Sequence, residues 1–185
     1  MRWEYMARVR QMSGFRIAIT GTPATGKTSV ATIVGANHTL TVRNLAEDHA
    51  CLGDFDEMDG SVEIDIEKLN NSLSPIWANK PPENIVVDGH LSHHLPVDAI
   101  VVLRCRPEVL SDRMRSRGWP ETKVSQNSEW EMMGGPWLEL DEKSVPIIEF
   151  DTTIAGITQI TQEILNWLES GFSPEYPSKR IDWLE

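Results

Sequence analysis

A glycine-rich stretch followed by lysine and threonine has the most definite chemistry in this sequence. Gly21, Gly26, Lys27 and Thr28 fit the pattern G-x-x-x-x-G-K-[ST]. Glycines let the backbone turn tightly, so that successive N–H groups point inward at phosphate oxygens. An apolar segment at 15–20 precedes the pattern and a helical segment follows it, which is the context that phosphate binding at a helix N-terminus requires. We therefore expect a nucleoside triphosphate to bind here.

The side chains of this loop have separate expected roles. Lys27 places a positive charge at the β- and γ-phosphates, and the Thr28 hydroxyl is positioned to ligate Mg²⁺. Ala24, Gly26 and Ser29 complete the expected nucleotide-binding set. The predicted cofactors are therefore ATP and Mg²⁺.

A second apolar segment, at 85–90, carries an acidic residue near its end. Ligands of open α/β sheets bind at the carboxyl ends of strands, so we expect Asp88 to hold Mg²⁺ or to orient the acceptor. His90 follows two residues later and is expected to act beside the same phosphates. His93 and His94 are expected to be loop residues, because their irregular spacing and the few nearby acids disfavour zinc.

A cluster of arginines follows the next apolar segment. Phosphoryl transfer spreads negative charge that planar guanidinium groups stabilise. Arg113 and Arg117 are four residues apart, so we expect them on one helix face, clamping the transferred group. We expect Arg117 also to contact ATP, at a hinge into a lid at 117–131. The remaining arginines, expected on the surface, are Arg104, Arg106 and Arg115.

Adenine requires a flat slot, which in such folds usually lies in the loop after the last strand. The segment at 151–153 is the candidate, with Asp151 and Thr152 as its predicted nucleotide-binding residues. The tryptophans at 119, 130 and 137 are expected to pack within the lid region.

Apolar segments alternate with helical patterns along the chain. This alternation is typical of a parallel sheet covered by helices on both faces. We therefore expect an α/β three-layer sandwich of the P-loop NTPase class, with about five parallel strands and inserted acceptor-binding and lid segments. Residues 15–170 are predicted to form one kinase domain, in which 43–80 is too polar for the core and forms the acceptor-binding flap. Residues 1–14 are an expected flexible leader, and 171–185 an expected loosely attached tail.

Composition limits the possible partners. The chain has 185 residues and a net charge of −11, which disfavours nucleic-acid binding and is explained more simply by solubility than by a basic partner. No apolar run approaches the roughly 18 residues that span a bilayer, so no membrane insertion is expected. Cys51 and Cys105 lack metal-binding spacing and indicate buried thiols in a reducing compartment.

Three stretches together resemble the adenylate kinase isoenzyme six family, also called CINAP, over about residues 15–170. They are GTPATGKTSVA, VVDGHLSHHLP and the segment VVLRCRPEVLSDRMRSRGWPETKVSQNSEWEM. The D-x-H of the family is matched by Asp88 and His90. Its lid signature is matched by Leu103, Arg104, Leu110, Arg113, Arg117, Gly118, Trp119, Lys123, Asn127 and Glu131.

The resemblance implies a nucleoside monophosphate kinase, with AMP the favoured acceptor, that also has ATPase activity. It further implies a role in late maturation of the small ribosomal subunit and of the 3′ end of its rRNA. The implied partners are the small-subunit protein uS11 and the pre-small-subunit particle, in the cytoplasm or, in a eukaryote, the nucleus. Ala24 stands where the family often has glycine, and the loop tolerates it if φ there is negative.

The residues leave alternatives open. An ATP-driven assembly factor is one, with Asp88 and His90 placing the attacking water. A kinase of a non-nucleotide metabolite, such as a sugar acid or shikimate, is another, since the same fold hosts both. A GTPase is disfavoured because the sequence lacks an N-K-x-D segment for reading guanine.

Overall fold

The computed structural model is built on a parallel sheet of five strands, ordered β2-β5-β1-β6-β7. It describes residues 14–56, 61–140 and 144–184, so the predicted leader lies almost wholly outside the described residues. The strand number and the parallel arrangement confirm the predicted fold class. The strands are β1 (Arg16–Thr20), β2 (Thr39–Thr41), β5 (Ile85–Asp88), β6 (Ala99–Arg104) and β7 (Ile147–Asp151).

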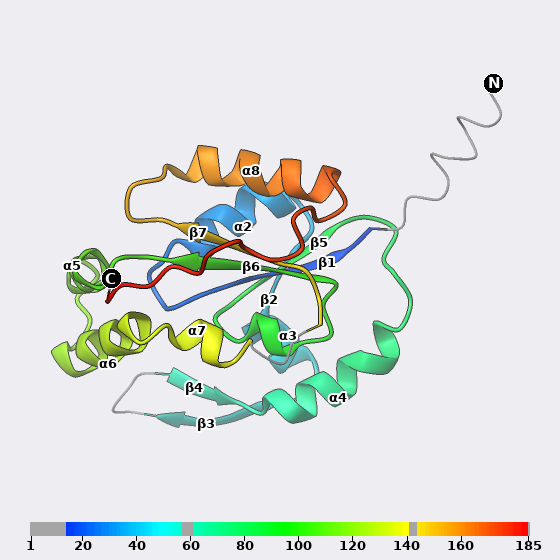
Figure 1. The fold of residues 1–185 in the computed structure, drawn as a ribbon. Helices are drawn as coiled ribbons and strands as arrows, with labels where there is room; N and C mark the ends of the chain where they lie inside the picture. Colours follow the sequence, from blue (N-terminus) through cyan, green and yellow to red (C-terminus); the bar gives the residue numbers. More distant parts are fainter. Residues whose placement is uncertain (1–13, 57–60, 141–143, 185) are drawn as a thin grey trace.

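Helices cover both faces of this sheet (Figure 1). Side chains alternate across a strand, so Ile17 and Ile19 face one layer and Ala18 faces the other. On the first face lie α2 (Lys27–Gly35) and α8 (Ile157–Glu169). The second face is covered by α3 (Val42–Asp48), α4 (Ile66–Ile76), the 3₁₀ turn η1 (Ser92–His94) and α7 (Gly135–Leu138). At the carboxyl end of the sheet lie α5 (Pro107–Arg115) and α6 (Glu121–Met132).

The segment at 43–80 is only partly a flap, contrary to the prediction. Its helices α3 and α4 bury apolar faces against the sheet, and Ala46, Leu69 and Leu73 are almost fully buried. The polar composition of the segment led to the wrong prediction. A helix needs only a few apolar residues at helical spacing to pack against the core. An antiparallel hairpin of β3 (Leu52–Asp56) and β4 (Ser61–Ile64) forms a sheet of its own (Figure 1).

The tail after α8 packs on the body of the protein, so the expectation of loose attachment was wrong. Phe172 is buried, with its ring centroid 5.0 Å from that of Trp167. The Ile147 N–H donates to the Glu175 carbonyl oxygen at 2.7 Å. The tail then returns across the molecule toward α5 and α6 (Figure 1). The tail thereby hydrogen-bonds to β7, the edge strand of the sheet. An uncovered edge strand exposes unpaired backbone groups on which other chains can aggregate.

In the part of the chain that the structure describes, no helix has the length and apolar character needed to cross a membrane.

The start of α4 provides a test of the described fold. Asp65 is the N-cap, and its Oδ1 accepts from the Lys68 N–H at 2.9 Å. Asp65→Ala should lower the free energy of unfolding by about 1 kcal/mol, because one N–H of the first turn loses its partner. Asp65→Ser keeps an acceptor and should stay near the parent value. Urea denaturation measures both, and equal loss in the two variants would contradict the capping role.

Candidate active site

The sheet brings the two predicted nucleotide-binding segments together. Strands β1 and β5 are neighbours, and Ile19 is paired in register with Asp88. The phosphate-binding loop, residues 21–28, therefore begins beside Asp88 at the carboxyl edge of the sheet. Gly21 has φ of 134°, and a Cβ there would lie 2.1 Å from the Leu103 carbonyl oxygen. Only glycine fits at this position, which explains the first residue of the pattern.

The lysine of the loop is held ready for phosphate. Its Nζ donates to the Thr22 carbonyl oxygen at 2.9 Å. Burial lowers the pKa of Lys27 to about 8, while the negative charges of Asp88 and Glu131 oppose this shift. The ammonium group thus lies in a poorly solvated site, where its positive charge attracts a phosphate more strongly than it would in water.

Ala24 adopts a backbone conformation that the sequence did not anticipate. Its φ is +71°, in the left-handed region, so the condition under which the loop was expected to tolerate alanine is not met. Alanine in this region costs about 1–2 kcal/mol relative to the right-handed conformation. Its methyl group is buried with Cys105, Leu110 and Met114, and this packing offsets part of the strain.

Thr28 and Asp88 form a site whose chemistry fits a magnesium ion. The Thr28 hydroxyl donates to Asp88 Oδ2 at 2.7 Å. Among the described residues, Asp88 Oδ1 is buried with no hydrogen-bond partner. A buried carboxylate oxygen without a donor is costly, and a hard cation with oxygen ligands removes that cost. These two predicted ligands therefore lie together as magnesium binding requires.

A cavity of about 480 Å³ lies in front of the phosphate-binding loop. His90 lines it, and its ring keeps contact with solvent. Desolvation by the surrounding protein, with the positive charge of Lys27, lowers the pKa of His90 to about 4, so the ring is neutral at pH 7. Beyond the loop, the walls come from β4, η1 and the α6–α7 region; they include Ser61, Val62, Glu63, Ile64, Leu91, His93, Lys123, Gln126, Asn127, Trp130, Pro136 and Glu139.

The structure separates the two arginines that the sequence placed on one helix face. Helix α5 ends at Arg115, so Arg117 lies beyond it and the shared face does not exist. Arg117 is exposed, and its positive charge is close enough to Lys27 to contribute to the lowered pKa of that lysine. Arg113 instead donates to the Thr152 carbonyl oxygen at 2.6 Å and to its hydroxyl at 3.2 Å.

The predicted adenine loop is well anchored. The Thr152 N–H and hydroxyl both donate to the Arg104 carbonyl oxygen, at 2.8 and 2.9 Å. The Asp151 carboxylate accepts from the Thr153 N–H at 2.7 Å. With Arg113 these bonds hold the loop against the end of β6. An adenine contact at Asp151 and Thr152 stays a prediction.

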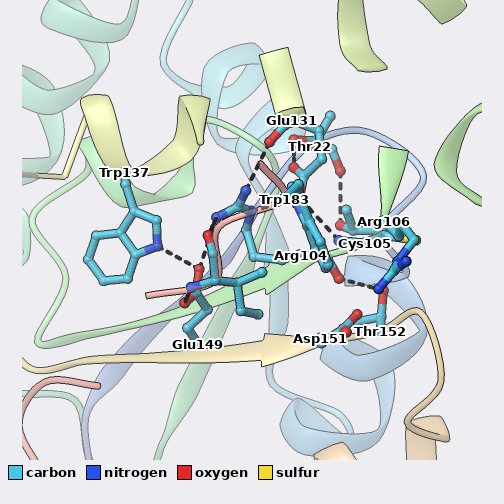
Figure 2. Close-up of polar contacts among 12 residues, drawn as sticks. Thr22, Arg104, Cys105, Arg106, Glu131, Trp137, Glu149, Asp151, Thr152 and Trp183 are labelled. Atoms are coloured by element: carbon cyan, nitrogen blue, oxygen red, sulfur yellow. Dashed lines mark hydrogen bonds and ion pairs between the residues drawn. The ribbon is translucent and has the colours of Figure 1, made fainter. Parts of the chain in front are cut away.

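Arg104 is fully buried, so its predicted surface position was wrong (Figure 2). Its Nε donates to Glu131 Oε1 at 2.7 Å, and its Nη1 donates to Glu149 Oε1 at 3.0 Å. The acids lie 27 and 45 residues further along the chain, which no local pattern reveals. Arg106 and Arg115 are exposed, as expected.

Glu131 is the residue of the site that reasoning from single residues missed. Its carboxylate accepts from the Thr22 hydroxyl, from the Cys105 N–H at 3.1 Å and from Trp183 Nε1 at 3.0 Å, in addition to Arg104 (Figure 2). One buried side chain thus joins the phosphate-binding loop, the end of β6, helix α6 and the tail. Its place in the lid signature was the one sign of importance in the sequence.

Comparison with known proteins gives a consistent family. A family model described as "AAA domain" matches residues 17–134. The chain is 37% identical over 172 residues to a protein of Archaeoglobus fulgidus and 35% identical over 169 residues to one of Pyrococcus abyssi. Both are named "Putative adenylate kinase", and the alignments cover 91% of each chain. The fold is also that of shikimate kinase from Acinetobacter baumannii, with a TM-score of 0.58 at 13% identity, covering 89% of this chain and 97% of that one.

Glu131→Gln tests the buried network. Breaking a buried ion pair costs about 3–5 kcal/mol, so the free energy of unfolding should fall by roughly 3 kcal/mol. The KM for ATP should also rise, because Thr22 loses a charged acceptor. Glu129→Gln is the matched control, since Glu129 is exposed on the same helix and contacts Ser125. Equal stability of the two variants in urea denaturation would contradict the structural role of Glu131.

Proposed function

The chain belongs to the family of archaeal proteins named "Putative adenylate kinase", and we propose that it transfers the γ-phosphoryl group of ATP to a nucleoside monophosphate, with AMP favoured. The observation that carries this proposal is the cavity in front of the phosphate-binding loop. It is bounded by the loop on one side and by β4 and α6 on the others. A cavity of about 480 Å³ suits a small acceptor lying beside the γ-phosphate.

The donor nucleotide is expected to lie along the loop. Backbone N–H groups of the loop and of the first turn of α2 are proposed to donate to the phosphates, and Lys27 to exchange its bond to the Thr22 carbonyl for phosphate oxygens. The base is proposed to rest against Asp151 and Thr152. The anchored backbone of that loop supports this, because a rigid wall loses little entropy on binding.

Catalysis in this proposal depends on positioning and charge. Thr28 and Asp88 would hold a magnesium ion, which when bound would supply positive charge to the phosphate oxygens. Lys27 and Arg117 then stabilise the negative charge that spreads over the transferred group. His90 is neutral at pH 7 and faces the same cavity, so it accepts or donates a hydrogen bond without adding charge.

The acceptor is proposed to occupy the space between hairpin and lid. Lys123 and Asn127 reach this space from α6, and the Asn127 amide donates to the Lys123 carbonyl oxygen at 2.7 Å. The cationic Lys123 suits the phosphate of the acceptor, and the amide of Asn127 suits its base or ribose. The surrounding Val62, Leu91 and Trp130 supply apolar surface for a base.

Product formation tests the proposal. ATP and Mg²⁺ are incubated with AMP, dAMP, CMP, UMP or GMP, beside a reaction without acceptor, and nucleotides are separated by chromatography. We expect a diphosphate of the acceptor to form with ADP, fastest with AMP. Lys27→Met should lower the rate at least about 100-fold, while Lys80→Met, at an exposed site, should not. ADP formation that every monophosphate leaves unchanged would contradict the kinase proposal.

The two arginines should behave differently on substitution. Arg117→Ala should lower kcat at least about 100-fold with little change in stability, because its exposed guanidinium is proposed to stabilise the transferred group. Arg113→Ala should lower the free energy of unfolding by about 2 kcal/mol, because charged hydrogen bonds to Thr152 are lost. Steady-state kinetics and urea denaturation of both variants separate these effects. Identical kinetic losses with unchanged stability would show that both act on phosphate.

A second candidate is the assembly-factor role that the family resemblance implied, with uS11 and the pre-small-subunit particle as partners. The net charge of −11 favours it, because an acidic chain attracts a basic partner. In that role ATP is hydrolysed, and the hydrolysis is stimulated by uS11. The reaction without acceptor, repeated with added uS11, separates this role from kinase activity, and unchanged ATPase activity would exclude it.

A further inference from the structure

Two histidines and a glutamate meet beside the cavity, which His93 and Glu139 line and Thr28 and Asp88 do not. His93 and His94 come from η1, and Glu139 follows α7, 46 residues from His93. The Nε2 atoms of the two histidines lie 3.1 and 3.7 Å from Glu139 Oε2. All three ligand atoms lie within 4.8 Å of one another.

The hydrogen bonds of Thr20 orient the buried histidine of this cluster. The Thr20 hydroxyl donates its one proton to the His90 carbonyl oxygen at 2.9 Å. The same oxygen therefore accepts from His93 Nδ1–H, which lies 2.7 Å away. The His93 Nε2 lone pair then points at Glu139 Oε2, so a positive centre must lie between these two atoms.

A metal ion is the positive centre that uses all three side chains. A proton between His93 and Glu139 explains the 3.1 Å distance, whereas a metal ion also explains why His94 Nε2 lies 3.7 Å from the same oxygen. Tetrahedral Zn²⁺ with bonds of about 2.0–2.1 Å separates its ligand atoms by about 3.3 Å, near the two distances seen here. Metal-bound histidines also commonly donate their other ring N–H to a nearby oxygen, as His93 does to Thr20.

We propose that His93, His94 and Glu139 bind a divalent transition-metal ion, with Zn²⁺ preferred. Two imidazoles and one carboxylate suit this class of ion better than Mg²⁺. His93 is 1% exposed, whereas Glu139 lines the cavity, so a fourth position opens toward it. This site goes beyond phosphoryl transfer and does not depend on it.

The sequence did not predict this metal site, and the reason is physical. Zinc was disfavoured because few acids lie near His93 and His94 along the chain. The fold supplies the acid from a distance, since Trp137 and Leu140 bury the α7 region in the same core as Leu95 and Val97. Glu139, between Trp137 and Leu140, is thereby held against the histidines.

Titration of the full chain with ZnCl₂ by calorimetry, after EDTA treatment and without nucleotide, tests the proposal. We expect one Zn²⁺ per chain, and at least about tenfold weaker binding in His94→Gln and in Glu139→Gln. These variants replace partly exposed groups, so folding is preserved. The control is His38→Gln, because His38 and Glu83 form an exposed pair at 2.9 Å that lacks a third ligand. This control should bind as the parent does.

Cobalt gives an independent readout of the ligand set. Co²⁺ added to the parent chain should show the intense visible absorption of a four-coordinate ion, and His94→Gln and Glu139→Gln should lose it. Two outcomes would overturn the proposal. One is the absence of stoichiometric zinc binding in the parent. The other is binding that these variants leave unchanged, which would place the ion elsewhere and leave a proton between His93 and Glu139.

Discussion

The buried pair of Glu131 and Arg104 is the interaction on which the arrangement of the site depends. A buried carboxylate is stable only when donors satisfy its oxygens, and those donors must come from elements held in fixed positions. Glu131 draws them from three segments of the chain, which are the phosphate-binding loop, the end of β6 and the tail. Glu149 extends the network, because it accepts from Arg104, from Trp137 Nε1 at 2.5 Å and from the Ile181 N–H at 2.7 Å. The tail is therefore part of the structure that supports the phosphate-binding loop.

This network fixes the C-terminal end of α6 beside the phosphate-binding loop. The N-terminal turn of α6 is joined to α5 through Gly118, which has a φ of 74°, and an ion pair with 2.8 Å between Arg115 Nε and Glu121 Oε1 holds it there. Lys27 is bonded within the loop through the Thr22 carbonyl oxygen. Phosphoryl transfer depends on a preorganised cradle of this kind for the donor.

Local patterns in the sequence predicted much of the fold and the centre of the site. The alternation of apolar and helical segments predicted about five parallel strands, and the sheet has five. Residue type and spacing predicted that Thr28 and Asp88 lie close together, because the phosphate-binding loop and the end of the neighbouring strand both serve a nucleotide phosphate. These successes share a cause, since each depends on residues adjacent in sequence or on the fixed edge at which parallel strands end.

The errors have the opposite character. Arg104 was placed on the surface because its two acids lie far along the chain, and the tail was considered loose because its partners are equally distant. The φ of Ala24 is decided by the loop as a whole and not by the residue. Glu139 joins two histidines through core packing. In each case long-range contacts override local preference, and a single sequence does not display them.

The reverse reaction tests the central claim most directly. The chain is supplied with ADP and Mg²⁺ alone, and ³¹P NMR follows the nucleotides over time. A phosphotransferase with both a donor and an acceptor site converts two ADP into one ATP and one AMP, and the account predicts equal amounts of these products. An ATPase cannot form ATP from ADP. Absence of ATP, or release of inorganic phosphate in its place, would contradict the proposed nucleoside monophosphate kinase.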